Sequence, residues 1–199
     1  MNDLEKKRIV SVLKYTWPFY IVSGIIIALA LSYTFRLTHR TPGYKKLTLF
    51  ISGEVTDSKN LRSDMLETYK DKGLEVVSFY SAKPTDKEYL TKLSVPGYNS
   101  SDVLIIPLTQ LDILNASAFA LDLQDELVNT YYSGYTLYQQ DYVNYGIKLN
   151  KDKVKNYITL PDEDCYLILN GKSENLGDYS KSPNKDHDMA LCLVQDWGM

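Results

Sequence analysis

The sequence predicts an α/β protein with one N-terminal transmembrane helix, followed by a three-layer α/β/α domain with a mainly parallel sheet. The first observation is an uncharged, largely apolar run at residues 15–35. The second is a strand-like segment followed by an amphipathic segment, a pattern that occurs twice within residues 46–93. The third is a further, strongly apolar segment at 102–108. Two such βα units and a third strand imply a parallel sheet with right-handed crossovers.

The apolar run has the dimensions of a membrane span. Lys14 and Arg36 flank it, and no charged side chain lies between them. At about 1.5 Å of rise per residue, a helix over 15–35 crosses a hydrocarbon core of roughly 30 Å. Pro18 is expected in the first turn of this helix, where its missing N–H costs little. Aromatic side chains, which favour the headgroup level, gather near both ends: Trp17, Phe19, Tyr20, Tyr33 and Phe35.

Two alternatives exist for this run. A buried core helix is the weaker one, because nothing else in the chain is apolar enough to surround it, and a cleaved signal peptide is the stronger one. Ala28-Leu29-Ala30 has the form of a cleavage site, and basic residues precede it. The apolar character continues to Phe35, however, and the leader at 1–14 is long, so we expect the segment to remain as an anchor. The predicted organisation is a cytoplasmic leader at 1–14, a transmembrane helix at 15–35, a tether at 36–46 and an extracellular α/β domain at 47–199.

The charges divide the chain into a basic and an acidic part. Eight basic and two acidic residues give residues 1–46 a net charge of +6, whereas 14 basic and 23 acidic residues give 47–199 a net charge of −9. The acidic part argues against nucleic acid as a partner, and the basic end suits anionic lipid headgroups. Lys and Arg are equally frequent on both sides of the span. A short basic leader usually stays in the cytoplasm, so we expect the domain outside the cell, in the cell membrane as a single-pass protein.

Five strands are expected in the domain. Buried parallel strands are apolar on both faces, and short apolar runs bounded by turn residues fit that description. The segments lie at 46–52, 74–80, 102–108, 146–149 and 164–170.

The first helix is expected at 60–72. Either Ser58 or Asn60 can cap it, and Gly73 follows its last turn. Its apolar side chains recur at helical spacing: Leu61, Met65, Leu66 and Tyr69. A second helix is expected after residues 83–86, with Tyr89, Leu90 and Leu93 as its apolar stripe and Pro96-Gly97 as its end.

The second half of the domain gives weaker patterns. Short helices are expected at 109–115 and 119–128, and a last helix at 189–197, capped by Asp186 or Asp188. The polar composition of 173–185 predicts an exposed loop.

Six tyrosines lie within residues 131–145. Four of them step by 3, 4 and 3 positions, which favours one face of a helix packed on the sheet: Tyr135, Tyr138, Tyr142 and Tyr145. The alternatives are a stacking platform for a sugar or aromatic ligand and an amphipathic face that meets a partner.

The candidate binding residues follow the first and third strands. In open α/β sheets ligands bind at the carboxyl ends of the strands, and here the loop 52–58 and Thr109 meet at that edge. Ordinary capping and loop polarity are the competing explanation. Glu54 and Asp57 would repel an anion, and the sequence contains neither nucleotide-binding nor hydrolase motifs.

Metal, cofactor and redox chemistry find little support in the sequence. Cys165 and Cys192 have no His or second Cys at metal-ligand spacing, and they are either one disulfide or two small buried residues. The triplet Asp186-His187-Asp188 is better explained by a helix cap with solvated neighbours. We expect no metal, no cofactor and no enzymatic activity.

The strand segments 47–52, 101–107, 145–149 and 164–170 resemble one lobe of bacterial extracellular solute-binding proteins of ABC transporters, which have the type 2 periplasmic-binding-protein fold. The resemblance covers roughly 47–110 and 145–199 and rests on loose hydrophobic strands. It implies ligand contacts from the loops after the first and third strands: Ser52, Gly53, Thr56 and Thr109. It also implies a shortened relative, because this domain is too short for two lobes.

The sequence therefore favours a membrane-anchored, extracellular, solute-binding-like domain that recognises a small ligand or a protein partner at the carboxyl ends of the strands. A membrane protein or transporter is the expected partner. The first alternative is an accessory subunit that serves only assembly of a membrane complex. The second alternative is a hydrolase whose site has no familiar motif.

Overall fold

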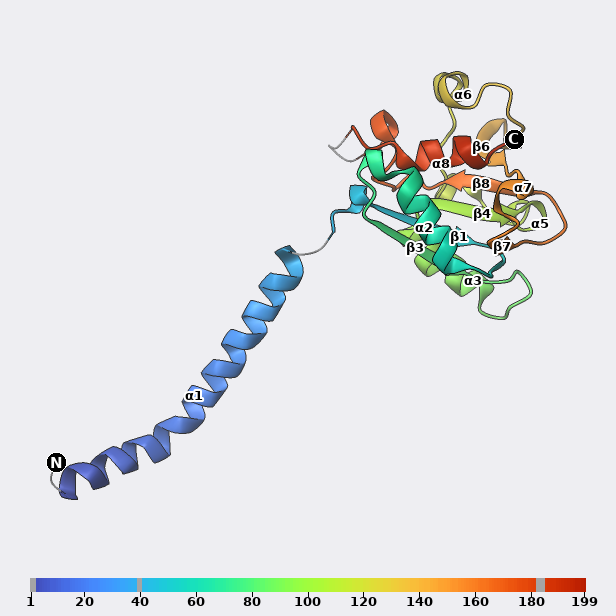
Figure 1. Ribbon diagram of the computed structural model, residues 1–199. Helices are drawn as coiled ribbons and strands as arrows, with labels where there is room; N and C mark the ends of the chain where they lie inside the picture. Colours follow the sequence, from blue (N-terminus) through green and yellow to red (C-terminus); the bar gives the residue numbers. More distant parts are fainter. Residues whose placement is uncertain (1–2, 39–40, 182–184) are drawn as a thin grey trace. The chain divides into compact units, whose positions relative to one another are not determined.

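The computed structural model describes residues 3–38, 41–181 and 185–199 (Figure 1). The chain divides into two compact units, Met1–Arg40 and Thr41–Met199. The boundary between them falls within the predicted tether at 36–46.

The first unit consists of the helix α1, Asp3–Thr38. It contains the one stretch of the described residues that is long and apolar enough to cross a membrane, Lys14–Phe35, and none of that stretch is buried. The helical prediction for 15–35 is confirmed, and the helix also includes most of the predicted leader. Because α1 begins at Asp3, Pro18 lies in the helix interior and not in a first turn, so it removes one N–H from the hydrogen-bond ladder.

The second unit is built on a six-stranded sheet in the order β3-β1-β4-β8-β6-β5. The pairs of β1 with β3 and β4 are parallel, and the pairs β4–β8, β8–β6 and β6–β5 are antiparallel. Four of the six strands consequently point in one direction, and the predicted fold class is confirmed. The strands are β1 Lys46–Ile51, β3 Val76–Ser81, β4 Val103–Pro107, β5 Leu137–Gln140, β6 Val143–Lys148 and β8 Cys165–Leu169.

Alternating side chains give the sheet two buried faces. Along β4, Val103 and Ile105 belong to one hydrophobic cluster, and Leu104 and Ile106 belong to another. The same alternation recurs in β1 and β8, as the period of two in a strand requires. The first face is covered by α2 Ser58–Thr68, α6 Asp125–Tyr131, α7 Lys151–Val154 and α8 Met189–Trp197.

The second face is covered by shorter helical pieces. These are α3 Tyr89–Lys92, a π-helical turn at Leu93–Gly97, α4 Tyr98–Ser100, α5 Leu108–Leu111 and a 3-10 turn at Ala116–Ala118. A separate two-stranded antiparallel sheet pairs β2 Glu54–Val55 with β7 Ile158–Thr159.

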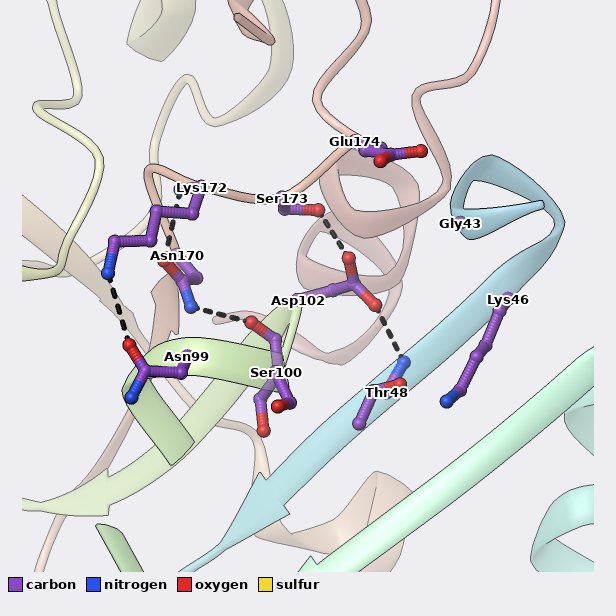
Figure 2. Close-up of a pocket in the computed structure, with 11 residues that line it drawn as sticks. Gly43, Lys46, Thr48, Asn99, Ser100, Asp102, Asn170, Lys172, Ser173 and Glu174 are labelled. Atoms are coloured by element: carbon purple, nitrogen blue, oxygen red, sulfur yellow. Dashed lines mark hydrogen bonds between the residues drawn. The ribbon is translucent and has the colours of Figure 1, made fainter. Parts of the chain in front are cut away.

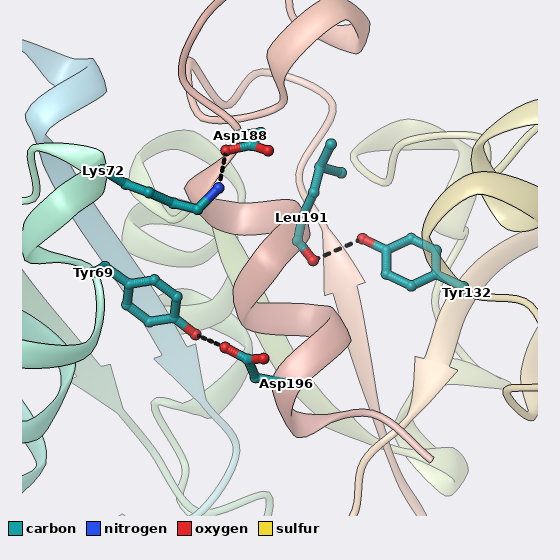
Figure 3. Close-up of polar contacts among 6 residues, drawn as sticks. All are labelled: Tyr69, Lys72, Tyr132, Asp188, Leu191 and Asp196. Atoms are coloured by element: carbon teal, nitrogen blue, oxygen red, sulfur yellow. Dashed lines mark hydrogen bonds and ion pairs between the residues drawn. The ribbon is translucent and has the colours of Figure 1, made fainter.

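The helix α8 is fastened to the first face by side chains from distant parts of the chain (Figure 3). Tyr69 Oη donates to Asp196 Oδ2 at 2.6 Å, and Lys72 Nζ lies 2.8 Å from Asp188 Oδ1. On its other side, the hydroxyl of Tyr132 donates to the carbonyl oxygen of Leu191. The predicted bounds of this last helix, 189–197, are confirmed. Asp188 stands at its N-cap position without a side-chain capping bond.

The cap of α2 differs from the expected one. Asp57, and neither Ser58 nor Asn60, occupies the N-cap, and its carboxylate accepts from the backbone N–H of Asn60 at 3.1 Å. Gly73 ends the helical segment with φ of 80°, the left-handed conformation that glycine adopts most easily.

The second predicted helix is only partly right. Tyr89 and Leu93 are buried as expected, but Leu90 is 61% exposed. Pro96 and Gly97 do not stop the helical path, because a π-helical turn carries it through both residues into α4.

The helix expected from the tyrosine spacing is wrong. Tyr138 lies in β5 and Tyr145 in β6, two strands of one hairpin, and both side chains are buried on the second face of the sheet. Asp141 and Tyr142 form the hairpin turn with φ of 52° and 67°, as in a two-residue primed turn. The tyrosine spacing therefore reflects two strands and a turn.

Two further expectations are corrected. The helix expected at 119–128 starts only at Asp125 and extends to Tyr131. Of the loop expected at 173–185, residues 182–184 lie outside the described residues. The described part is not simply exposed, because Ser173 and Asn175 bind the carboxylate of Asp102 at the start of β4. The buried residues of this part are Ser173, Asn175, Leu176, Gly177 and Ser180.

Candidate functional site

The two ends of β1 and β4 are the places where polar groups gather in the domain. The carboxyl ends hold the four residues predicted from the sequence. The amino ends hold a polar pocket that the sequence did not indicate.

At the carboxyl end of β1, Ser52 and Gly53 are buried. The Ser52 N–H donates to the carbonyl oxygen of Ile105 at 2.9 Å, which joins β1 to β4 beyond the strand itself. The hydroxyls of Ser52 and Tyr89 share a hydrogen bond of 2.8 Å inside the core. The N–H and the hydroxyl of Ser52 are therefore both engaged within the protein.

Residues 157–163, which we call the covering segment, lie over this end of the sheet. The Thr56 N–H donates to the Tyr157 carbonyl oxygen at 2.9 Å, and the two-residue sheet of β2 and β7 continues the contact. A Cβ placed at Gly53 would collide with the carbonyl oxygen of Thr159, so only glycine permits this close approach.

Thr109, at the carboxyl end of β4, is bound to the same segment. Its backbone N–H and its hydroxyl lie 2.9 Å and 2.8 Å from the two carboxylate oxygens of Glu163. The structure thus brings Ser52, Gly53, Thr56 and Thr109 to one end of the sheet, where the backbone N–H of each and the hydroxyls of Ser52 and Thr109 bind the protein's own chain. Their role in binding a ligand stays a prediction.

At the amino ends of β1 and β4 lies a pocket of about 230 Å³, which we call the polar pocket (Figure 2). Its walls come from the start of β1, from α4, and from the turn that follows β8. Its lining residues are almost all polar: Gly43, Lys46, Thr48, Asn99, Ser100, Ser101, Asp102, Asn170, Lys172, Ser173 and Glu174.

Asp102 forms the base of the polar pocket and is 9% exposed. Its Oδ2 accepts from the Thr48 N–H at 2.7 Å, and its Oδ1 accepts from the Ser173 hydroxyl at 2.5 Å and from Asn175 Nδ2 at 3.2 Å. Burial raises the pKa of this carboxyl to about 6, although the three donors favour the charged form and oppose the shift.

The network around Asp102 extends into the turn after β8. Asn175 Nδ2 also donates to the Lys46 carbonyl oxygen at 2.9 Å, while Asn170 Nδ2 donates to that of Ser101 at 2.7 Å. Within the described residues, Asn175 Oδ1 is buried without a hydrogen-bond partner. The network fixes the floor of the pocket and leaves one acceptor unused.

The rim of the polar pocket carries charges of both signs. Lys46 and Lys172 supply ammonium groups, and Glu174 supplies a carboxylate. Lys172 Nζ donates to Asn99 Oδ1 at 3.2 Å (Figure 2). A small ligand with several hydrogen-bonding groups fits this lining better than an apolar one does. The volume is below the roughly 300–1,000 Å³ typical of drug-sized ligands.

The two cysteines and His187 have little freedom within the described part of the domain. Cys165 and Cys192 are both free thiols, and burial raises the pKa of Cys165 to about 11, so this thiol stays protonated at neutral pH. The ring of His187 stacks on Tyr44 with centroids 4.2 Å apart. Across the described ranges, no group of three or more His, Cys, Asp or Glu residues could hold a metal ion.

Sequence reasoning missed the polar pocket because its residues form no motif. Asp102 directly precedes the apolar run of β4, and Asn170 directly follows β8. Polar residues at such positions are usually solvated strand ends. Only the antiparallel pairing of β4 with β8, which the sequence does not specify, brings these two residues together.

No family model matches the chain, and no curated protein sequence matches it. Among solved structures, an ABC substrate-binding protein, Lmo0181 from Listeria monocytogenes, in complex with cycloalternan, is similar with 15% sequence identity and a TM-score of 0.33. The match covers 56% of this chain and 32% of that chain, so this chain spans about a third of the neighbour's length. The likeness in fold is weak and carries no conclusion about a ligand.

Proposed function

We propose that the chain is a single-pass membrane protein whose 41–199 unit is a non-enzymatic recognition domain outside the cell. The observation that carries the anchoring is the apolar stretch Lys14–Phe35, of which no part is buried. A helix with this composition is stable in water only if its apolar surface is covered, and a bilayer covers it along its whole length.

Membrane extraction tests the anchor. We expect the full-length protein to sediment with membranes, to resist alkaline carbonate and to dissolve in detergent. Intact-mass analysis should find residues 1–35 still attached. A mature protein that begins after Ala30 would show that the helix is a signal peptide, in which case the anchoring proposal fails.

Recognition of a ligand is proposed at the strand ends. The polar pocket is open as it stands, and its donors and acceptors suit a small polar molecule. The sequence-predicted residues Ser52, Gly53, Thr56 and Thr109 are the second candidate, and a ligand there must displace the covering segment. The two candidate sites lie at opposite ends of β1 and can be separated by mutation.

Thermal-shift screening with sugars, amino acids and short peptides tests recognition. A ligand present at 100 times its Kd stabilises the folded state by about 2.7 kcal/mol. If the ligand binds in the polar pocket, the double variant Asn99→Ala with Lys172→Ala should no longer be stabilised by the ligand. The double variant Ser52→Ala with Thr56→Ala should keep the ligand-induced rise in melting temperature. The reverse result assigns the ligand to the carboxyl ends. If none of the sugars, amino acids or peptides raises the melting temperature, the domain does not recognise these ligand classes.

An accessory subunit in a membrane complex is the second candidate function, because the hairpin tip carries an aromatic side chain suited to a protein partner. Tyr142 is 96% exposed and has φ of 67°, a strained conformation for a tyrosine. Gln140, in the same hairpin, accepts from the Ala116 N–H and donates to the Leu114 carbonyl oxygen. Ile113, which precedes Leu114 in the chain, is 78% exposed.

Affinity purification from cells tests this second function. If the hairpin tip docks a partner, Tyr142→Gly should relieve the backbone strain, raise stability and reduce the amount of copurified partner. If the Tyr142→Gly variant copurifies as much partner as the unchanged protein does, Tyr142 does not dock a partner and no longer supports the assembly function.

A further inference from the structure

A second cavity, of about 350 Å³, lies between α2 and α8, and we call it the α2–α8 pocket. Leu61 and Met65 of α2 form an apolar floor and are almost completely buried. Three aromatic side chains line the walls: Tyr69, Tyr157 and Trp197. The volume lies within the range of roughly 300–1,000 Å³ found for ligand pockets.

Two carboxylates of the α2–α8 pocket are held in place by tyrosine hydroxyls. Tyr69 Oη donates to Asp196 Oδ2 at 2.6 Å, and Figure 3 shows the two side chains meeting between α2 and α8. Tyr157 Oη donates to Asp64 Oδ2 in the same way. Burial and the bond to Asp196 raise the pKa of Tyr69, and the bond to Asp64 raises that of Tyr157, so both hydroxyls remain donors at neutral pH.

The second oxygen of each carboxylate is available to a ligand. In the part of the chain that the structure describes, neither Asp64 Oδ1 nor Asp196 Oδ1 has a hydrogen-bond partner in the protein. Lys153 is the one basic residue of the lining, and it forms an ion pair with neither carboxylate in the described ranges. Two carboxylates against one ammonium group, in a domain with 14 basic and 23 acidic residues over 47–199, favour a cation.

Arginine is the cation whose shape fits these features. Its planar guanidinium has five N–H donors, stacks on aromatic rings and can bridge two carboxylates. Its aliphatic stem can pack on the apolar floor, and a cation near tyrosine and tryptophan rings gains further attraction. The geometry points to the α2–α8 pocket as a recognition site for an arginine side chain presented by a partner protein. This site shares Tyr157 with the covering segment but contains none of Ser52, Gly53, Thr56 and Thr109. The inference does not rest on the function proposed for the strand ends.

The test uses the full-length protein in detergent micelles and a defined peptide. The probe is acetyl-Gly-Arg-Gly-amide, and its matched control carries citrulline, a neutral residue of the same shape. The chain has two tryptophans, so the indole N–H resonance of Trp197 is assigned by comparison with Trp17→Phe. We expect the arginine peptide to shift the Trp197 resonance in a saturable manner and the citrulline peptide to bind at least about tenfold more weakly.

Two double variants that lose the same number of charges distinguish binding in the α2–α8 pocket from general electrostatic attraction of the peptide to the acidic domain. Asp64→Asn with Asp196→Asn removes both charges but keeps an acceptor for each tyrosine hydroxyl, so the fold should be retained. We expect it to weaken arginine binding by at least about tenfold. Asp71→Asn with Asp122→Asn, at exposed positions outside the pocket, should change binding by less than about twofold at physiological salt.

Three outcomes overturn the inference. Equal binding of the citrulline peptide would show that a neutral polar ligand is sufficient. An equal loss in the Asp71 and Asp122 control would show unspecific attraction to an acidic domain. Absence of saturable binding to the unchanged protein, with a folded domain by circular dichroism, would show that the pocket does not recognise arginine.

Discussion

The two ends of β1 and β4 are closed in different ways. At the carboxyl ends, the covering segment at 157–163 rests on backbone groups, on one glycine and on a half-exposed glutamate. At the amino ends, a buried carboxylate collects three donors from β1 and from the turn after β8. One end is held by backbone contacts and by one carboxylate near the surface, and the other by a buried carboxylate.

This difference has an energetic meaning. Removing one partner of a buried, hydrogen-bonded charge leaves several groups without a partner at once, whereas an exposed hydrogen bond is easily replaced by water. We therefore expect the amino ends to be the rigid part of the domain. The covering segment should open at a much lower free energy than global unfolding.

The largest effect is expected from Asp102→Ala. It leaves the Thr48 N–H, the Ser173 hydroxyl and the Asn175 amide without their acceptor, and it opens a cavity. The free energy of unfolding should fall by about 3–5 kcal/mol, measured by denaturant titration. Asp122→Ala, at an exposed position, should change it by less than about 0.5 kcal/mol. Similar values for both variants would refute the distinction between the two ends.

The second effect concerns pH. The folded pKa of Asp102 is raised from 3.8 to about 6, so the folded state holds this proton more tightly than the unfolded state does. The contribution of Asp102 to stability is therefore complete below pH 4 and is lost as pH rises through 6. At 1.36 kcal/mol per pKa unit, the loss is about 3 kcal/mol.

Comparison with Asp102→Asn isolates this contribution. The asparagine cannot ionise, so the difference in unfolding free energy between the two proteins should depend on pH between 4 and 7. The unchanged protein should lose more stability than the variant over that interval. Parallel curves would show that Asp102 does not titrate there and that its charge is fully compensated by its donors.

A smaller effect is expected at the other end from Gly53→Ala. The added methyl group meets the carbonyl oxygen of Thr159, which belongs to the backbone and has to shift. We expect a loss of about 1–3 kcal/mol, as for other overpacking substitutions, and faster hydrogen exchange at the Thr56 amide. Gly171→Ala is the matched control, because Gly171 has no left-handed φ and a Cβ there would meet the Ala120 carbonyl oxygen only at an ordinary distance of 3.5 Å. An equal loss in both variants would argue against close packing by the covering segment.

The side-chain periodicity within a segment predicts which residues form one strand or one helix. The apolar segments of β1, β3 and β4, the helix α2 and the helix α8 follow from periodicities of two and 3.6 residues. Asp141 and Tyr142 show where such reasoning fails. Neither residue is the glycine that a primed hairpin turn usually contains, so nothing in the sequence interrupted the helical spacing of the tyrosines.

The candidate sites depend on contacts that are distant in sequence. Ser52 and Thr109 were placed at one edge by the general rule for parallel strands, and that placement is correct. The covering segment was not foreseen, because Glu163 reaches Thr109 across 54 positions. Likewise, Asp102 and Ser173 are 71 positions apart, and the polar composition after β8 gives no local sign that Ser173 binds a buried carboxylate.

The smallest effect is expected from Glu163→Gln. The carboxylate accepts from both the N–H and the hydroxyl of Thr109, but it lies near solvent, and glutamine keeps one acceptor. The free energy of unfolding should therefore fall by only about 0.5–1 kcal/mol. Hydrogen exchange is the more sensitive measurement. Loss of the Glu163–Thr109 contact should speed exchange at the Thr109 and Thr56 amides. The Thr48 amide, which donates to Asp102 at the other end, should exchange at an unchanged rate. Faster exchange at Thr48 as well would mean that the two ends open together, and the covering segment would then be part of the rigid domain.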